Sequence, residues 1–133
     1  MNVFKAKITD LKTEGSLTLV ILMAKDIELT AIVVDTPQTA PYLTRGNLVE
    51  VLFKETEVII SSDIKNSVSL ENQIIGVIST IETGSLLSRI QIGTPLGEIV
   101  AHITSKATKQ LKLKKGAQVA ALIKTNELML AAQ

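Results

Sequence analysis

Apolar and polar residues alternate along most of the chain, and this pattern predicts a protein built mainly from β-strands. From Phe4 to Ile8, every second residue is apolar and the residues between them are lysines, as in a strand with one buried face. Glycine-containing turns separate further runs of β-branched and aliphatic residues. The predicted strands cover residues 4–9, 17–23, 28–34, 48–53, 58–60, 74–81, 87–92, 98–103, 119–123 and 128–131.

Two short helices are predicted between these strands. Thr36-Pro37 fits a helix N-cap followed by proline at the first helical position, and Arg45-Gly46 fits its end. Pro41 keeps this helix short, because proline disrupts a helix interior. The second helix is expected over residues 105–115, ended by Gly116.

The chain contains an internal repeat with an offset of 70 residues. The clearest match lays Gly46-x-x-Val49-x-x-Leu52-x-Lys54 on an identical pattern that begins at Gly116. Each copy then reads strand, strand, strand, short helix, strand, strand, which is the order of an OB-like Greek-key barrel. We therefore expect an all-β protein of two tandem OB-like barrels, with domains at 1–62 and 69–133 and a polar linker at 63–68.

Charge and rare residue types restrict the function. The net charge is +1, so no overall field favours nucleic acid or a membrane. Without cysteine and with His102 as the single histidine, a thiolate or imidazole metal site is not expected, and we interpret His102 as a packed or interfacial residue. No motif supplies a nucleophile and base, so we expect neither catalysis nor a cofactor.

The second half offers donors for a small anion. Residues 99–126 contain six lysines and no acidic residue. Thr104 and Ser105 stand at the start of the second helix, where free N–H groups favour anions, and Lys124 recurs at the position of Lys54. Simpler interpretations stay open: a solvated lysine face, an ordinary N-cap, and a lysine that guards a strand edge.

No secretory signal or membrane span is visible. The residues after Met1 enter a strand directly, and the longest apolar run, 19–24, is too short to cross a bilayer. The expected location is the cytoplasm.

Three segments of the second half are distinctive: Ser69-Leu70-Glu71-Asn72-Gln73, Ile103-Thr104-Ser105 and Ala121-Leu122-Ile123-Lys124-Thr125. Together they resemble the Mop domain of the molbindins, small cytoplasmic proteins that bind molybdate or tungstate and are related to TOBE domains. The resemblance covers residues 69–130 almost without gaps and residues 2–60 more loosely, so the chain is similar to a tandem-Mop molbindin.

The resemblance implies a non-catalytic protein that stores or buffers oxyanion, assembled as a homotrimer. It places the ligand at interfaces between Mop units, held by backbone N–H groups, hydroxyls and a lysine. Two departures stand at Glu71, where the family motif usually has arginine, and at Ala107, where it has serine. The implied oxyanion-binding residues are Ser69, Asn72, Thr104, Ser105, Lys124 and Thr125.

Two other functions stay open. An OB-type nucleic-acid-binding module would fit the barrel order, but it calls for aromatic stacking platforms and a basic groove, and the chain has only three aromatic residues. A Mop-derived regulatory or assembly domain that no longer binds oxyanion would fit the departures at Glu71 and Ala107.

Overall fold

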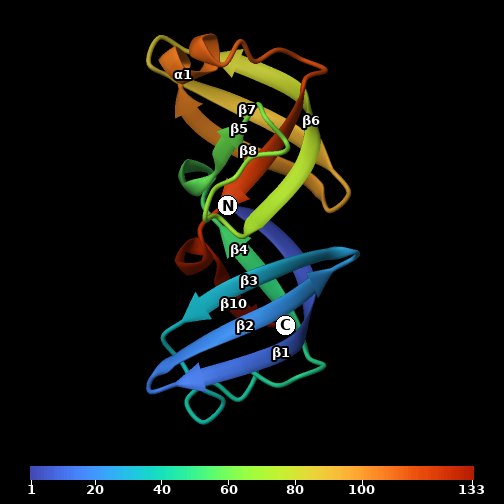
Figure 1. Cartoon of the computed structure of the whole chain (residues 1–133), viewed down its shortest axis with the longest axis vertical. Helices are drawn as coiled ribbons and strands as arrows, with labels where there is room; N and C mark the ends of the chain where they lie inside the picture. Colours follow the sequence, from blue (N-terminus) through green and yellow to red (C-terminus); the bar gives the residue numbers. More distant parts are fainter.

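The computed structural model describes residues 1–133 as two five-stranded antiparallel sheets stacked along the long axis of the molecule (Figure 1). The sheets run in the orders β10-β4-β1-β2-β3 and β5-β9-β6-β7-β8, and each curls into a barrel-like half. The all-β, two-barrel prediction is confirmed. The strands are β1 (Asn2–Glu14), β2 (Leu17–Ala24), β3 (Ile27–Val33), β4 (Leu48–Phe53), β5 (Ile59–Ser61), β6 (Asn72–Thr83), β7 (Leu87–Thr94), β8 (Gly97–Thr104), β9 (Gln118–Ile123) and β10 (Met129–Ala132).

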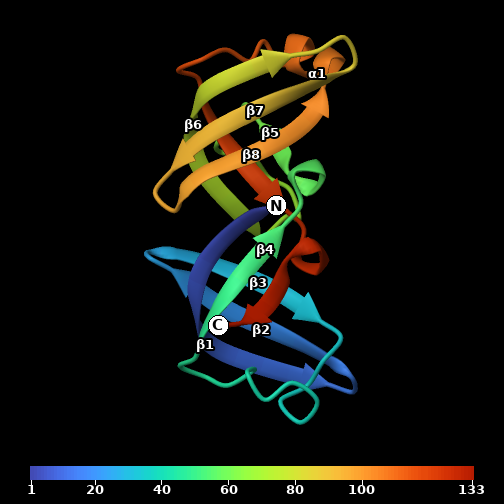
Figure 2. The same cartoon turned by 180° about the vertical axis from the view of Figure 1, so that it is seen from behind.

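Each sheet takes its fifth strand from the other repeat. In register, β5 pairs with β9 of the second repeat, and β10 pairs with β4 of the first. Both views show β5 in the upper half and β10 in the lower half, so the chain crosses between the halves twice (Figures 1 and 2). The structural halves therefore do not coincide with the sequence repeats 1–62 and 69–133.

Short 3-10 helices lead into the exchanged strands. Residues Glu55–Glu57 form η1 before β5, and Thr125–Glu127 form η2 before β10. The helix η1 packs against β8, and η2 packs against β3. The exchange thus brings the residues that follow β4 to the second half and those that follow β9 to the first half.

Two asparagines fasten the halves together through equivalent bonds. The side-chain amide of Asn72 accepts from the backbone N–H of Thr30 (2.7 Å) and donates to its carbonyl oxygen (2.8 Å). Asn2 does the same with Val100, at 2.9 Å for both bonds. Because position 2 corresponds to 72 and position 30 to 100, the two amide bridges follow the internal repeat. They join the first strand of each repeat to the third strand of the other.

Replacing Asn72 with Ala should destabilise the protein by about 2 kcal/mol, because it leaves two buried backbone groups of Thr30 without partners. Urea unfolding measures the loss. The matched control, Asn2→Ala, should cost less, since the bonds of Asn2 are only partly buried. Equal losses would show that burial does not set the strength of these bridges.

One hydrophobic core runs through both halves. A single cluster of 25 buried residues draws on every strand of the first repeat and on the second repeat as far as Leu128. Phe4 and Phe53 meet inside it with ring centroids 5.7 Å apart. Otherwise the core consists of aliphatic side chains, which pack well on pleated surfaces. Two halves of this size therefore share one core rather than each supporting its own.

The helix predicted in the first repeat is absent, which corrects the expectation of one helix per barrel. Thr36 does cap a turn: its carbonyl accepts from the N–H of Ala40 (2.7 Å), and its hydroxyl accepts from Thr39. Pro41 stops it there, because it has no N–H to continue the ladder and disfavours helical geometry at Ala40. Residues 34–47 are turns and irregular backbone.

The second repeat keeps its helix, but in shortened form. The helix α1 covers Ser105–Gln110 and not residues 105–115. Leu111 ends it, and Lys112 then takes a left-handed conformation with φ of 53°. Gly116 lies beyond the helix, where its N–H donates to the carbonyl of Ile78 (2.8 Å).

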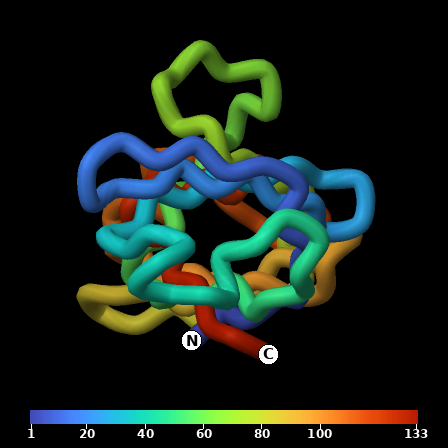
Figure 3. The backbone as a smooth tube through the Cα atoms, turned by 90° about the horizontal axis from the view of Figure 1, so that it is seen from below, coloured from blue at the N-terminus to red at the C-terminus, as the bar shows by residue number.

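Residues 62–71 form an arm that stands out from both halves (Figure 3). Two hydrogen bonds between the side-chain amides of Asn66 and Gln73, of 3.1 and 2.9 Å, tie the arm to the start of β6. None of the helices reaches the length and apolar character needed to cross a bilayer.

Candidate functional site

The predicted binding residues lie at three separate places. Thr104 and Ser105 join β8 to α1, Lys124 and Thr125 join β9 to η2, and Ser69 and Asn72 flank the start of β6. The first place is at the outer end of the second half, where α1 appears in Figure 1. The other two lie close together, because β6 begins opposite Ile123 and Lys124 follows that residue. They lie where the halves meet, since Asn72 bonds to Thr30 of β3 and η2 packs against β3.

Thr104 is an exposed helix cap, and Ser105 is a buried structural residue. The Thr104 hydroxyl accepts from the N–H of Ala107 at 3.0 Å, which leaves its own proton free to donate. The Ser105 hydroxyl donates to the carbonyl of Gly84 (2.7 Å) and meets the hydroxyl of Ser88 (2.9 Å). Ser105 is thus committed to the β6–β7 turn, and Thr104 is the member of the pair that faces outward.

Lys124 and Thr125 form the second group of donors. Lys124 is exposed, and its ammonium group makes no hydrogen bond or ion pair. Its carbonyl accepts from Glu127 at 2.9 Å, which closes the single turn of η2. This turn packs against β3, so both donors lie beside the first repeat rather than beside Thr104.

At the start of β6, Asn72 and Ser69 differ in accessibility. Asn72 is fully buried, and its amide is engaged with Thr30 as described above. Ser69 is exposed in the arm and makes no side-chain hydrogen bond, and Glu71 is also exposed. The arm therefore presents a hydroxyl and a carboxylate to the surroundings, while Asn72 holds the strand in place.

Strand exchange separates donors that the sequence places together. Lys124 lies on the turn packed against β3, whose following residue is Val34, the repeat equivalent of Thr104. Thr104 instead ends the strand against which η1 packs, and that turn carries Lys54 and Glu55. Within one chain, then, Lys124 and Thr125 lie against the third strand of the first repeat, whereas Thr104 ends the third strand of the second repeat, against which the turn with Glu55 packs.

The carboxylate of Glu55 is held ionised. A hydrogen bond from the terminal amine of Met1, followed in size by a bond to its own backbone N–H, lowers the pKa of Glu55. The nearby His102 also lowers it. A negative charge at this position disfavours an anion beside Lys54.

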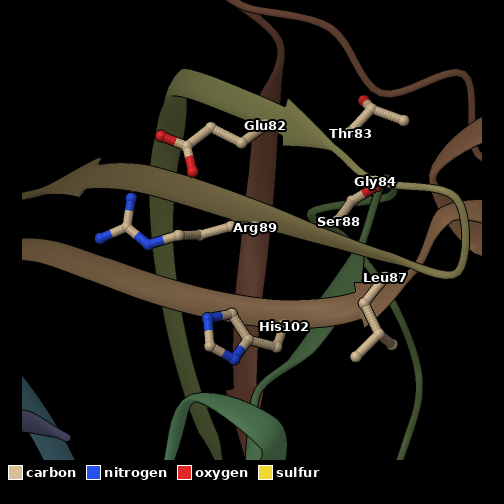
Figure 4. Close-up of a pocket in the computed structure, with 7 residues that line it drawn as sticks. All are labelled: Glu82, Thr83, Gly84, Leu87, Ser88, Arg89 and His102. Atoms are coloured by element: carbon tan, nitrogen blue, oxygen red, sulfur yellow. The ribbon is translucent and has the colours of Figure 1, made fainter.

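A shallow groove of about 390 Å³ follows the outer face of β6, β7 and β8 (Figure 4). Cross-strand pairing places Arg89 between Glu82 and His102 on this face. Neither the guanidinium of Arg89 nor the imidazole of His102 makes a hydrogen bond or a salt bridge. Arg89 carries no motif that marks it in the sequence, although pairing of the predicted strands 87–92 and 98–103 places it opposite His102.

No group of three or more acidic, histidine or cysteine side chains is arranged to hold a metal ion. Among the predicted binding residues, the exposed side chains are the hydroxyls of Ser69 and Thr104 and the ammonium group of Lys124, which suit a tetrahedral anion better than a cation. Fold and side chains together define a tandem pair of OB-like barrels. Their surfaces carry anion donors that do not converge on one point within a single chain.

The comparisons with known proteins agree with this description. Residues 69–130 match the TOBE domain family. Over 64 residues, 47% of this chain, the sequence is 42% identical to the molybdenum transport protein ModE of Herbaspirillum seropedicae; the match takes in 23% of that protein.

Among solved structures, the chain is similar to the cytoplasmic molybdate-binding protein ModG, crystallised with molybdate bound. The match covers 99% of this chain and 96% of the ModG chain, with 28% sequence identity and a TM-score of 0.92. MopII from Clostridium pasteurianum matches 50% of this chain and all of its own, with 24% identity and a TM-score of 0.48. Residues 69–130 therefore form a TOBE domain, and along nearly its whole length the chain is similar to the molbindin ModG.

Proposed function

We propose that the chain is a non-catalytic oxyanion-binding protein that stores or buffers molybdate or tungstate in the cytoplasm. The observation that carries this proposal is the match to molybdate-bound ModG along nearly the whole of both chains. The exposed donors Thr104 and Lys124, with the half-buried Thr125, supply the chemistry, since hydroxyls and an ammonium group are suitable partners for a tetrahedral dianion.

The proposed binding sites lie between chains of a homotrimer. A dianion needs several converging donors, and one chain does not bring Thr104 together with Lys124. A second copy can supply the missing half, because each chain exposes both sets of donors on different surfaces. In this arrangement Ser69 contributes from the arm, near the start of β6 where Asn72 pairs with Ile123, whereas Asn72 and Ser105 shape the site from inside.

Equilibrium titration with molybdate, tungstate and sulfate tests the proposal, and Lys124→Ala should weaken molybdate binding at least about tenfold. A charge-assisted hydrogen bond to an anion contributes roughly 1.5 to 3 kcal/mol. The matched control is Lys54→Ala, which should have little effect because Glu55 follows Lys54. Absence of molybdate and tungstate binding by the unaltered protein would refute the function and favour an assembly domain without ligand.

Replacing Glu71 with Arg should tighten molybdate binding at low salt. The change exchanges a repulsive carboxylate for a forked donor, and Glu71 is exposed on the same arm as Ser69. The gain should shrink as salt is added, because screening is strongest for exposed charges. The control Glu14→Arg adds the same charge away from the arm and should leave affinity unchanged. If Glu71→Arg behaves like this control, the arm does not reach the ligand.

A further inference from the structure

The outer end of the second half carries a dense group of lysines. They lie on α1 and on the turn that follows it, at the end of the molecule away from the first half (Figures 1 and 2). All of them are exposed, and none donates a side-chain hydrogen bond or forms a salt bridge. We call residues 106–115 the basic cap. Its lysines are Lys106, Lys109, Lys112, Lys114 and Lys115.

Backbone hydrogen bonds hold the basic cap in a fixed shape. The N–H groups of Leu111, Lys112 and Leu113 donate back to carbonyls of α1, at 3.0, 3.0 and 3.1 Å. On one side of the cap Ser105 bonds to the β6–β7 turn, and on the other side Gly116 bonds to β6. The lysines are therefore carried on folded backbone that is fastened to the barrel.

The first repeat shows that the fold does not need this charge. The positions equivalent to the lysines of the cap hold Thr36, Thr39, Tyr42, Thr44 and Arg45. Arg45 is the one charged residue among them, and it pairs with Asp10 at 2.6 Å. Lys115 takes the place of Arg45, but Thr80 takes the place of Asp10, so the second repeat lacks the acidic partner. Unpaired like charges repel one another and lower stability, so a cluster of them favours a partner of opposite charge.

Exposed leucines lie beside the basic cap. The N–H of Ser105 donates to the carbonyl of Leu86 at 2.8 Å, which places the β6–β7 turn next to the start of α1. Leu86 is 79% exposed, Leu87 is 59% exposed, and Leu111, inside the cap, is 37% exposed. Aliphatic side chains beside lysines are typical of surfaces that bind at the interface of a membrane, where the apolar groups enter the headgroup layer and the charges meet anionic lipids.

We infer that the basic cap docks on a membrane surface that contains anionic phospholipids, with Leu86 and Leu111 reaching into the headgroup layer. Clusters of roughly four to eight lysines or arginines bind such surfaces through the negative charge of the headgroups. The inference goes beyond the proposed function. The cap contains neither Thr104 nor Lys124, so docking does not depend on a bound oxyanion.

The composition of the cap favours lipid over protein or nucleic acid. Protein interfaces are depleted in lysine and rich in aromatic residues and arginine, and the basic cap contains neither an aromatic residue nor an arginine. Nucleic-acid sites use arginine and stacked aromatic side chains to hold bases. Lipid headgroups require only positive charge at a surface, which the lysines supply.

Co-sedimentation with vesicles tests the inference. At low salt the unaltered chain should bind vesicles of phosphatidylcholine and phosphatidylglycerol in a ratio of about three to one, and it should not bind vesicles of phosphatidylcholine alone. Replacing Lys109, Lys114 and Lys115 together with Gln should weaken binding on the order of a hundredfold, because each lysine near an anionic surface contributes about a fivefold factor.

Two matched controls separate the cap from general effects of charge and hydrophobicity. Replacing Lys5, Lys7 and Lys12 with Gln removes the same charge from exposed positions of the first repeat and should weaken binding far less. Leu86→Ser should weaken binding about fivefold or more without any change of charge. Val34→Ser removes an apolar side chain that is 75% exposed in the first repeat and should leave binding unchanged.

Absence of binding to the anionic vesicles, or equal losses in the two triple variants, would overturn the inference. Equal binding by Leu86→Ser and Val34→Ser would also overturn it, because no leucine would then enter the headgroup layer. Binding of the unaltered chain to double-stranded DNA or to poly-glutamate, without binding to vesicles, would assign the cap to another class of partner and refute the lipid surface. Thermal melting monitored by circular dichroism checks that each variant folds; if the triple variant of the cap does not fold, the comparison of Leu86→Ser with Val34→Ser decides.

Discussion

Mixed oligomers of a Thr104→Val chain and a Lys124→Ala chain should bind molybdate, although oligomers of either variant alone should bind it about tenfold to a hundredfold more weakly. The reason is that Thr104 and Lys124 lie at different places of one chain, so a complete site takes one from each of two chains. Each lost contact removes roughly 1.5 to 3 kcal/mol.

Co-expression of the two variants, followed by calorimetric titration, measures the recovery. In a random one-to-one mixture about a quarter of the sites regain both residues, because each of the two contributing chains has an even chance of being the suitable variant. Thr104→Val is a suitable change because valine occupies the equivalent position 34. If the mixture shows no tight sites, the donors act within one chain and the proposed interface is wrong.

Replacing Ile60 with Ser should destabilise the second repeat rather than the first, to which Ile60 belongs in sequence. Ile60 is 7% exposed and lies in β5, which pairs with β9. Burying a hydroxyl and leaving space in the core should cost roughly 3 kcal/mol. In native-state hydrogen exchange, the largest loss of protection is expected in β9 and β6.

The reciprocal variant, Leu130→Ser, provides the control. Leu130 lies in β10 and pairs with Val51 of β4, so its effect should appear in the first repeat. It is half-buried, and the loss should therefore be smaller. Loss of protection in β4 for Ile60→Ser, and in β9 for Leu130→Ser, would contradict the exchange of strands.

The strands were predictable because alternation of apolar and polar residues is local. The predicted range 48–53 matches β4 residue for residue, and most other strands differ only at their ends. The barrel order followed from the repeat. Which copy of the fifth strand enters which sheet did not follow, because β5 and β10 have similar patterns and would fit either β4 or β9.

Thr104 and Lys124 were predicted as anion donors from the sequence, and both are exposed, but the sequence did not reveal their separation in space. The sequence also did not show that Asn72 and Ser105 are buried, since the residue type alone does not tell whether an amide or hydroxyl bonds to protein or to solvent. Pro41 was enough to rule out the helix predicted in the first repeat. Position 41 corresponds to Leu111, whose N–H bonds to the carbonyl of Ala107 at the end of the second helix, and proline has no N–H to make such a bond.

The position of β10 has a consequence for how the chain is synthesised. The first repeat is complete in sequence by residue 62, but the free edge of β4 is closed only when Met129–Ala132 leave the ribosome. Until then the nascent chain exposes an unpaired edge strand, which is prone to associate with other strands. The first sheet is therefore expected to finish folding only after the second repeat has been synthesised, when β10 closes it.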